Sequence, residues 1–356
     1  MIKTLYKFYF NLFSTNYNIK DISTLKLNKN DVVIIISNTA LGDTLLSTPA
    51  IKSLKKSFPD IKVIAILKKA FSPLFYNFKY IDEIIEYDGN YKNFFSTIKK
   101  IKKYKPKLAL ILHSNGPQDI QLCVLSKCQY ILKHPTKSKL KKYLSFDFKK
   151  KKQHTIEDRL DLIRKIGGEK IDTTMEIQES KNIKIETKFK QFKDYIGFQI
   201  GAADIYKIWP IERFIKLAKE LVQNNEKIVI TGIKKEYELA QKIVNECGKN
   251  VINMCGKTSI EELPYLIKNL KLLITNDTGT MHLAIALKTP TISLFSATDP
   301  KGIGPYQDLN IHKVIYKNGS FIQKLPKKQR DDSAMKLINV DDVIKAYKEL
   351  NENLSL

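Results

Sequence analysis

Residues 272–295 read LLITNDTGTMHLAIALKTPTISLF, and this stretch decides the fold class. Leu272 to Thr275 has strand character, Met281 to Leu287 reads as a helix of small residues, and Thr291 to Phe295 reads as a second buried strand. A strand, a turn, a helix and a strand in this order give two adjacent parallel strands. The sequence therefore predicts an α/β protein.

The turn inside this stretch, Asn276 to Gly279, joins the carboxyl end of a strand to the amino end of a helix. Free N–H groups and the helix dipole attract an anion at such a place. Asp277 or Thr278 can cap the helix, and Gly279 lets a ligand approach the backbone. His282 follows one turn later. The turn alone leaves two interpretations open: Asp277 and His282 bind an anion, or they only cap and pack.

The same alternation extends outward in both directions. Asp31 to Ser37 is a continuous apolar run, typical of a strand buried on both faces, and it feeds a turn at Asn38 to Asp43. A helix is expected from Thr44 to Ser57, interrupted at Pro49. Further strands are expected at 61–67, 81–86, 108–112, 195–200, 227–231 and 251–254, and further helices at 93–103, 155–166, 211–224, 237–247, 259–269 and 341–351.

Two domains of this kind fit a chain of 356 residues. Residues 173–194 are polar and weakly patterned, so we expect the linker between the domains there. The predicted division is 1–180 for the first domain, 190–325 for the second, and 326–356 for a C-terminal tail and helix. If the two halves stack, turns at the carboxyl ends of their strands face one cleft, where open α/β sheets bind ligands.

The net charge of +24 requires an anionic partner or a compositional explanation. Only four of the 61 basic residues are Arg, whereas specific readers of nucleic acid rely on Arg for bidentate contacts. We therefore expect no nucleic-acid partner. A Lys-dominated excess fits a coding bias or attraction to anionic lipid.

Two segments bear on a membrane surface. Nine lysines between Lys133 and Lys152 stand against one acid, Asp147, and form either a solvated loop or a basic lip for an anionic acceptor or lipid. The first 18 residues are apolar and aromatic, without a signal-peptide cleavage pattern, and could lie on a membrane or on the protein. No run is long enough to cross a bilayer.

The four cysteines lack metal-ligand spacing and suit a reducing cytoplasm. A cytoplasmic protein is expected, either free or peripheral on the cytoplasmic face of the inner membrane.

Three charged residues at strand ends are candidates for chemistry. Asp43 could act as a general base or only cap a helix. Lys207 could neutralise a phosphate or be an ordinary surface lysine. Glu236 could accept hydrogen bonds from a sugar or ribose hydroxyl, or only favour the helix dipole.

Several other chemistries lack their motifs. The sequence has no Walker loop, no GxGxxG, no GxSxG and no HExxH. It also lacks an Asp-x-Asp pair that would hold a metal-bound nucleotide diphosphate. We therefore predict no metal and no cofactor, and a leaving diphosphate stabilised by Lys and helix N-termini.

Five segments, in order, resemble glycosyltransferase family nine, the lipopolysaccharide heptosyltransferases and their relatives. These are NTALGDTLLSTPAIKSLKKSF (38–58), GAADIYKIWP (201–210), VITGIKKEYELA (228–240), GKTSIEEL (256–263) and NDTGTMHLAIALKTPTISLFSATDP (276–300). HTIEDRLDLIRKIGG (154–168) is similar to the family's linking helix. The resemblance covers roughly residues 30 to 310.

The resemblance implies a GT-B fold, two Rossmann-like α/β domains with parallel sheets facing a central cleft. It implies an inverting, metal-independent transfer of a sugar, heptose from ADP-heptose, onto a lipopolysaccharide or lipooligosaccharide acceptor. By the same resemblance Asp43 is the general base and Lys207 meets the diphosphate. The implied donor-binding residues are Gly201, Ala202, Ala203, Glu236 (ribose), Thr258 (base), Asp277, Thr278, Gly279 and His282, and the acceptor-side residues are Gly42, His113 and Asn115.

This chain departs from the family pattern at several positions. Ala202 and Ala203 stand where heptosyltransferases often carry phosphate-binding hydroxyls, so only backbone contacts are expected there. Thr280 replaces a more usual Pro or Leu, and HSNGPQD (113–119) resembles divergent members. The alternatives are a divergent member using another nucleotide sugar, a non-catalytic nucleotide-sugar-binding protein of the same fold, and an epimerase or phosphorylase on the same frame. The motif order disagrees with the last of these, and an idle copy need not keep Asp43, Lys207 and Asp277.

Overall fold

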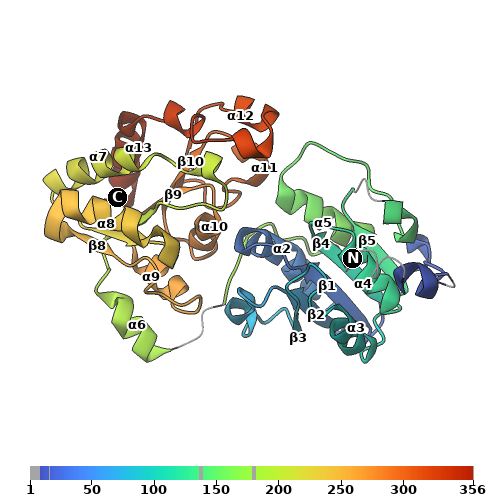
Figure 1. Ribbon diagram of the computed structural model, residues 1–356. Helices are drawn as coiled ribbons and strands as arrows, with labels where there is room; N and C mark the ends of the chain where they lie inside the picture. The colour runs from blue at the N-terminus through green and yellow to red at the C-terminus, as the bar shows by residue number, and fades with distance from the viewer. Residues whose placement is uncertain (1–8, 16, 136–138, 179–181, 356) are drawn as a thin grey trace. The chain divides into compact units, whose positions relative to one another are not determined.

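The computed structural model describes residues 9–15, 17–135, 139–178 and 182–355. The chain divides into two compact units, Met1–Gln178 and Glu179–Leu356, called here the N-terminal and C-terminal units (Figure 1). Each unit is built on its own parallel β-sheet. The predicted α/β class with two parallel sheets is confirmed.

The sheet of the N-terminal unit has the strand order β3-β2-β1-β4-β5. Central β1 pairs in parallel with β2 and β4, so that Ile34 lies beside Ile64 on one side and Ala109 on the other. All three residues are fully buried, as expected for strands covered on both faces. The strands are β1 (Val32–Ser37), β2 (Lys62–Leu67), β3 (Glu83–Glu86), β4 (Leu108–His113) and β5 (Tyr130–Lys133).

Helices cover both faces of this sheet (Figure 1). Helices α2 (Leu41–Ser57) and α5 (Thr155–Lys165) pack against each other, and α3 (Phe94–Lys102) packs against α4 (Gln118–Leu125). Because α2 starts directly after β1, its first turn lies at the carboxyl edge of the sheet. This edge carries the candidate residues of the unit.

Pro49 does not interrupt α2, contrary to the sequence prediction. The helix runs unbroken from Leu41 to Ser57 with Pro49 inside it. A proline lacks the N–H that would bond the carbonyl four residues earlier, here that of Leu45. The hydroxyl of Thr48 donates to this carbonyl at 2.7 Å and replaces the missing bond. The helix therefore continues through the proline.

The sheet of the C-terminal unit has the order β11-β10-β9-β6-β7-β8, with every recorded pairing parallel. Central β6 pairs with β9, which places Gln199 beside Thr275 at their carboxyl ends. Both loops that follow these strands therefore leave from neighbouring points. The strands are β6 (Ile196–Gln199), β7 (Ile228–Thr231), β8 (Val251–Asn253), β9 (Leu272–Asn276), β10 (Thr291–Phe295) and β11 (His312–Tyr316).

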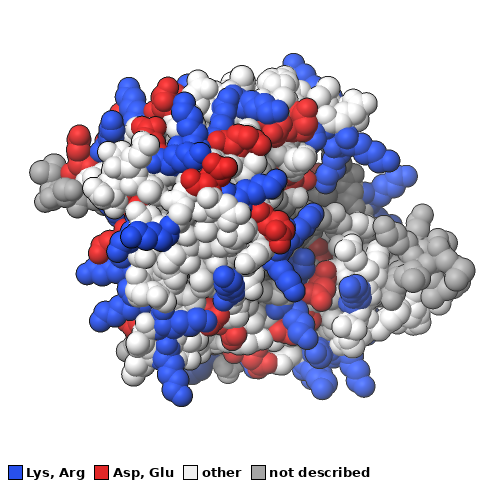
Figure 2. Space-filling model, turned by 60° about the vertical axis from the view of Figure 1, so that its left-hand side comes forward, with Lys and Arg blue, Asp and Glu red and all other residues white. Residues whose placement is uncertain are grey.

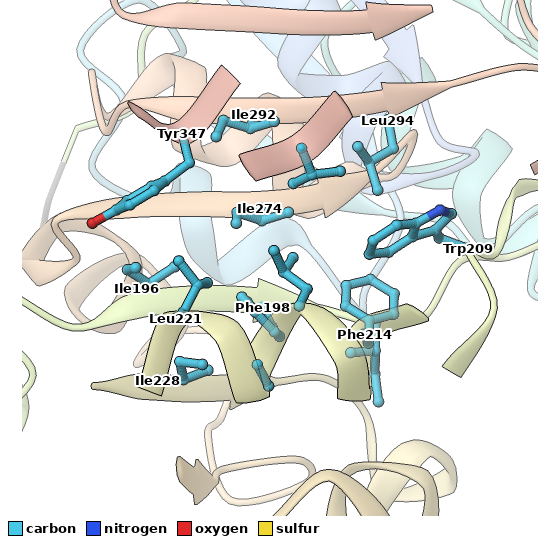
Figure 3. Close-up of a cluster of buried hydrophobic side chains, with 14 of the residues drawn as sticks. Ile196, Phe198, Trp209, Phe214, Leu221, Ile228, Ile274, Ile292, Leu294 and Tyr347 are labelled. Carbon is cyan, nitrogen blue, oxygen red and sulfur yellow. The ribbon is translucent and has the colours of Figure 1, made fainter. Parts of the chain in front are cut away.

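The core of this unit lies between the sheet and a helical layer (Figure 3). Trp209 is fully buried against Phe214, with ring centroids 4.9 Å apart, and donates its indole N–H to the carbonyl of Ile338. Helix α13 contributes Tyr347 to the same core. The helices of the unit are α6 (Ile183–Lys190), α7 (Ile211–Gln223), α8 (Tyr237–Cys247), α9 (Leu263–Asn269), α10 (Gly279–Ala286), α11 (Pro300–Ile303), α12 (Phe321–Lys324) and α13 (Val340–Ser355).

The segment predicted as a linker, 173–194, is only partly one. Met175 and Ile177 are buried in the N-terminal unit, and α6 occupies much of the rest, with Phe189 fully buried. Helix α4 and strands β5 and β11 were not predicted, and α9 begins four residues later than predicted. In the described residues, no helix is both long and apolar enough to cross a membrane.

Candidate active site

Asp43 lies in the first turn of α2, directly beyond the carboxyl end of β1. The N-cap of this helix is Ala40, which makes no side-chain cap bond, so Asp43 is not a capping residue. Its carboxylate instead accepts a hydrogen bond at Oδ2 from the hydroxyl of Thr39, at 2.7 Å. The side chain keeps 27% of its surface exposed. A partly exposed carboxylate at this edge is available to a ligand.

His113 ends β4 beside this carboxylate. Its Nδ1 lies 2.6 Å from the Thr39 hydroxyl, and its Nε2 lies 3.4 Å from Oδ1 of Asp43. Burial lowers the pKa of His113 to about 4, so the ring is neutral at pH 7. The structure thus brings His113 to Asp43. Gly42 is buried next to Asp43, and Asn115 is exposed in the loop after β4.

Arg159 completes this group, and sequence reasoning did not assign it a role. It comes from α5, and its Nη1 donates to the backbone carbonyl of Asp43 at 2.5 Å. The side chain is 2% exposed, yet it carries a charge. A signal was present, because Arg159 is three residues from Ile156 and therefore lies on the apolar face of the predicted helix. We call Thr39, Asp43, His113 and Arg159 the Asp43 cluster.

Lys207 and Asp277 form the centre of a second group, in the C-terminal unit. Lys207 ends the short 3-10 helix Ile205–Lys207 in the loop after β6, and Asp277 follows β9. The Lys207 Nζ lies 2.5 Å from Oδ2 of Asp277, which is 7% exposed. The N-cap of α10 is Thr278. The interpretation that Asp277 only caps the helix is therefore wrong.

Asn276 joins the two loops of this group and was not among the predicted site residues. Its side chain is fully buried. The amide nitrogen donates to the carbonyl of Ile200 at 3.0 Å, and the amide oxygen accepts from the backbone N–H of Trp209 at 3.1 Å. Both ends of the loop that carries Lys207 are thereby fixed to the end of β9. The sequence signal that could have identified this residue is a polar Asn at the end of an apolar strand.

Glu236 lies against two glycines at the carboxyl ends of β6 and β7. Its Oε2 accepts from the N–H of Ile233 at 2.9 Å, and burial raises the pKa of the carboxyl. A Cβ on Gly201 would lie 1.6 Å from Oε1 of Glu236, and one on Gly232 would lie 2.2 Å from Oε2. Only glycines leave room for this carboxylate. Gly201 therefore allows the Glu236 carboxylate to keep this position.

The remaining predicted donor-site residues differ in how far they are exposed. Gly279 is the first residue of α10, whose first N–H groups lack partners within the helix. His282 is 4% exposed in α10, so little of it is open to a ligand. Ala202 and Thr258 are half-buried, and Ala203 is exposed. We call Lys207, Glu236, Asn276, Asp277 and the start of α10 the Lys207 cluster.

Within the described part of the chain, no three His, Cys, Asp or Glu side chains are grouped so that they could hold a metal ion. Each cluster instead pairs carboxylates with cations from the protein itself: Arg159 near Asp43, and Lys207 at Asp277.

A comparison with known families decides the classification. The sequence profile described as "Glycosyltransferase family 9 (heptosyltransferase)" matches residues 137–337, which is more than half of the chain. The chain belongs to glycosyltransferase family 9. It is therefore a glycosyltransferase, and the family assignment made from the sequence motifs is confirmed.

Two comparisons extend beyond the matched segment. Lipopolysaccharide heptosyltransferase 3 of Escherichia coli K12 is 29% identical over 330 residues, which cover 87% of this chain and 95% of that protein. A family 9 glycosyltransferase from Veillonella parvula superposes with a TM-score of 0.76 at 22% identity, covering 91% of this chain and 98% of that one.

A third comparison concerns a structure with a bound nucleotide. E. coli heptosyltransferase WaaC with ADP superposes with a TM-score of 0.69 at 18% identity, covering 90% and 98% of the two chains. Together with the two parallel α/β units, these likenesses establish the GT-B fold for this family 9 member.

Proposed function

We propose that this family 9 enzyme is an inverting, metal-independent heptosyltransferase. Its donor is ADP-heptose, and its acceptor is a glycolipid of the lipopolysaccharide or lipooligosaccharide type. The observation that carries the proposal is the Lys207–Asp277 pair at the N-terminus of α10, at the carboxyl edge of the sheet. Open α/β sheets bind their ligands at this edge.

The Lys207 cluster has the chemistry that a nucleotide diphosphate needs. A lysine ammonium and the free N–H groups of a helix N-terminus both stabilise phosphate oxygens. Asp277 holds Lys207 in place, and Thr278 and Gly279 begin the helix. Glu236 is the candidate for the ribose hydroxyls and Thr258 for the base, while Ala202 and Ala203 offer only backbone groups to phosphate. The E. coli WaaC structure named above contains ADP.

The Asp43 cluster supplies the base. In the proposed step, the acceptor oxygen attacks the anomeric carbon from the face opposite the diphosphate, which inverts the centre. The new C–O bond forms as the bond to the diphosphate breaks, and the bonding electron pair leaves with the diphosphate. The proton of the acceptor hydroxyl passes to Asp43. Lys207 and α10 stabilise the charge that develops on the leaving group. Gly42, His113 and Asn115 line the acceptor side.

In this proposal the two roles are divided between the two domains. The domain of residues 1–180 binds the acceptor, and that of residues 190–325 binds the nucleotide sugar. The tail of residues 326–356 completes the second domain, since Ile338 and Tyr347 belong to its core.

The acceptor proposed here is anchored in lipid, so we place the enzyme at the cytoplasmic face of the inner membrane. The charge supports this location. Residues 1–178 carry 33 Lys and Arg against 16 Asp and Glu, whereas residues 179–356 carry 28 against 21. The excess therefore lies mainly on the acceptor-binding side, where an anionic membrane surface would attract it.

The test is a donor panel with one acceptor. Purified protein is incubated with ADP-heptose, UDP-glucose or GDP-mannose, with de-acylated lipooligosaccharide as acceptor, in the presence and absence of EDTA. The proposal predicts transfer from ADP-heptose alone, unchanged by EDTA. Transfer from another donor would identify a divergent member. Nucleotide binding without transfer would indicate a non-catalytic protein, and a loss in EDTA that Mg²⁺ restores would refute metal independence.

A further inference from the structure

Arg159 is a buried cation whose hydrogen bond and ion pair are both made with Asp43. Its Nη1 donates to the backbone carbonyl of Asp43 at 2.5 Å, and its Nη2 lies 3.7 Å from Oδ1 of the Asp43 side chain. Nε and Nη2 have no hydrogen-bond partner among the residues that the structure describes. Burying an arginine is costly unless a counter-charge offsets the loss of water. Asp43 supplies that charge from 116 residues away in the sequence.

Thr39 and His113 hold the other side of the carboxylate. The Thr39 hydroxyl has one proton, which it donates to Oδ2 of Asp43. It therefore accepts from His113 at Nδ1, which places the proton of the neutral ring on that nitrogen. Oδ2 is thus occupied by a donor, whereas Oδ1 points toward the bare Nε2 of His113 and the guanidinium of Arg159. Of the two carboxylate oxygens, Oδ1 is free to take a proton.

The charges around this carboxylate come from three elements. Arg159 and Asp158 lie on α5, His113 ends β4, and Lys133 ends β5. His113 is uncharged at neutral pH because burial and the nearby cations Arg159 and Lys133 oppose its protonation. Asp158 is a second carboxylate near Arg159, and its Oδ1 lies 3.0 Å from Nε2 of His134. Arg159 is therefore the cation whose guanidinium contacts both the backbone carbonyl and the carboxylate of Asp43.

We propose that Arg159 is the positioning residue of the catalytic base. Arg159 donates a hydrogen bond to the backbone carbonyl of Asp43 and lies beside Oδ1, while Thr39 donates to Oδ2. These contacts orient Asp43 so that Oδ1 receives the proton of the acceptor hydroxyl. Helix α5, the last helix before the C-terminal unit, thereby controls the geometry of the base. This inference rests on the proposed role of Asp43 but adds a residue that no motif assigned.

A double-mutant cycle tests the coupling without any substrate. The unfolding temperature of the N-terminal unit is measured by calorimetry for wild type, Asp43→Asn, Arg159→Gln and the double variant. Asp43→Asn leaves the buried Arg159 without its counter-charge, and Arg159→Gln leaves the partly exposed Asp43 without its cation. The double variant should therefore melt about 4 °C or more above the temperature that additive losses predict. Additive losses would overturn the pairing. If Arg159→Gln does not fold, Arg159→Lys takes its place in the same cycle.

Steady-state kinetics test the positioning role, with ADP-heptose and de-acylated lipooligosaccharide as probes. Arg159→Gln should lower kcat about tenfold or more with an unchanged donor KM, since the base is misplaced but the Lys207 cluster is intact. Arg159→Lys should recover part of this loss. Arg164→Gln is the matched control, because Arg164 lies on the same helix but pairs with Glu157 and Asp161 at the surface. It should behave as wild type.

Two outcomes separate this inference from the proposed function. An Arg159→Gln enzyme that melts earlier but keeps the wild-type kcat below its melting temperature would make Arg159 merely structural and overturn the inference. If Asp43→Asn kept full turnover, the proposed base would be wrong, and the positioning inference would fall with it. A failure of ADP-heptose as donor alone would refute only the donor assignment, because the double-mutant cycle needs no substrate.

Discussion

The Oδ2 atom of Asp43 accepts a hydrogen bond from Thr39, and the Oδ1 atom lies near His113 and Arg159. Replacing Asp43 by Asn keeps the shape but removes the proton acceptor. Asp43→Asn should therefore lower turnover by about 100-fold or more, the usual scale for loss of a general base. Donor affinity should hardly change, because the Lys207 cluster is untouched. Turnover assays and calorimetric titration with ADP measure the two quantities. Near-normal turnover in the folded variant would remove Asp43 from the mechanism.

Gly201 is a second position where one added atom, a Cβ, is expected to change ligand binding. In Gly201→Ala the new Cβ meets Oε1 of Glu236, so the carboxylate must leave its place. We expect ADP affinity to fall about tenfold, the loss of a charge-assisted hydrogen bond to the ribose. Adding Glu236→Gly should remove the clash without restoring affinity. The control is Gly302→Ala, where an added Cβ meets nothing within 4 Å. Unchanged ADP affinity in Gly201→Ala would contradict the role of Glu236.

His312 on β11 predicts a pH effect on stability. Burial lowers its pKa to about 4 from the ordinary 6.5, so the unfolded chain binds a proton there before the folded one does. The stabilisation is complete above pH 6.5 and is lost as the pH falls toward 4. Between pH 7.5 and 5.0 this amounts to about 2 kcal/mol. In His312→Gln that part of the loss should vanish.

The sole tryptophan, Trp209, lies in the core of the same unit as His312. Its fluorescence during urea unfolding at the two pH values therefore reports the relevant transition. Equal losses in wild type and His312→Gln would show that the buried ring does not titrate in this way.

At the scale of an element, α2 shows how a helix contains a proline. The Thr48 hydroxyl donates to the carbonyl of Leu45 at 2.7 Å and accepts from the N–H of Glu176 at 3.2 Å. Thr48→Val leaves both groups unsatisfied and should cost about 1–3 kcal/mol of unfolding free energy. In a Pro49→Ala background the new N–H at position 49 can bond the Leu45 carbonyl, so the same change should cost less. Equal costs in the two backgrounds, measured by calorimetry, would contradict this explanation.

The elements that the sequence predicted are those with a continuous apolar run or a clear helical period. Strand β11 was missed because it is an edge strand with alternating burial, and β5 is four residues long at the start of a Lys-rich segment. Asp43, Lys207 and Asp277 could be predicted because they follow buried strands. Arg159 and Asn276 could not be assigned from sequence spacing, since their partners lie 116 and 67 to 76 residues away and only the folded chain brings them together.

At the scale of the whole molecule, charged side chains of both signs share the face seen in Figure 2. Lys and Arg side chains are spread over that face with Asp and Glu side chains between them. Such mixing is unlike the concentrated basic surface of a nucleic-acid-binding protein. The N-terminal unit nevertheless carries the larger excess, 33 basic against 16 acidic residues. A diffuse excess of this kind suits attraction to a broad anionic surface.

An apolar feature accompanies this charge. Residues 9–13 are helical, and the rings of Tyr9 and Phe95 lie 4.7 Å apart, while Leu12 and Phe13 are 58% and 54% exposed. The ring of Phe10 packs on Tyr143, 5.4 Å away, which ties this helix to the Lys-rich segment. Exposed aromatic and aliphatic side chains beside lysines are typical of a helix that lies in a membrane interface.

We therefore expect the protein to sediment with anionic liposomes at low salt and to be released at high salt. Each Lys near an anionic surface contributes about 1 kcal/mol, and the screening length falls to about 3 Å at 1 M salt. Replacing Lys149 to Lys152 by Gln should weaken sedimentation and spare ADP binding; all four are exposed. The matched control changes four exposed lysines of the C-terminal unit to Gln: Lys242, Lys249, Lys345 and Lys348. Equal weakening by both sets would mean that net charge alone acts, and a wild-type protein that ignores anionic liposomes at low salt would refute membrane docking.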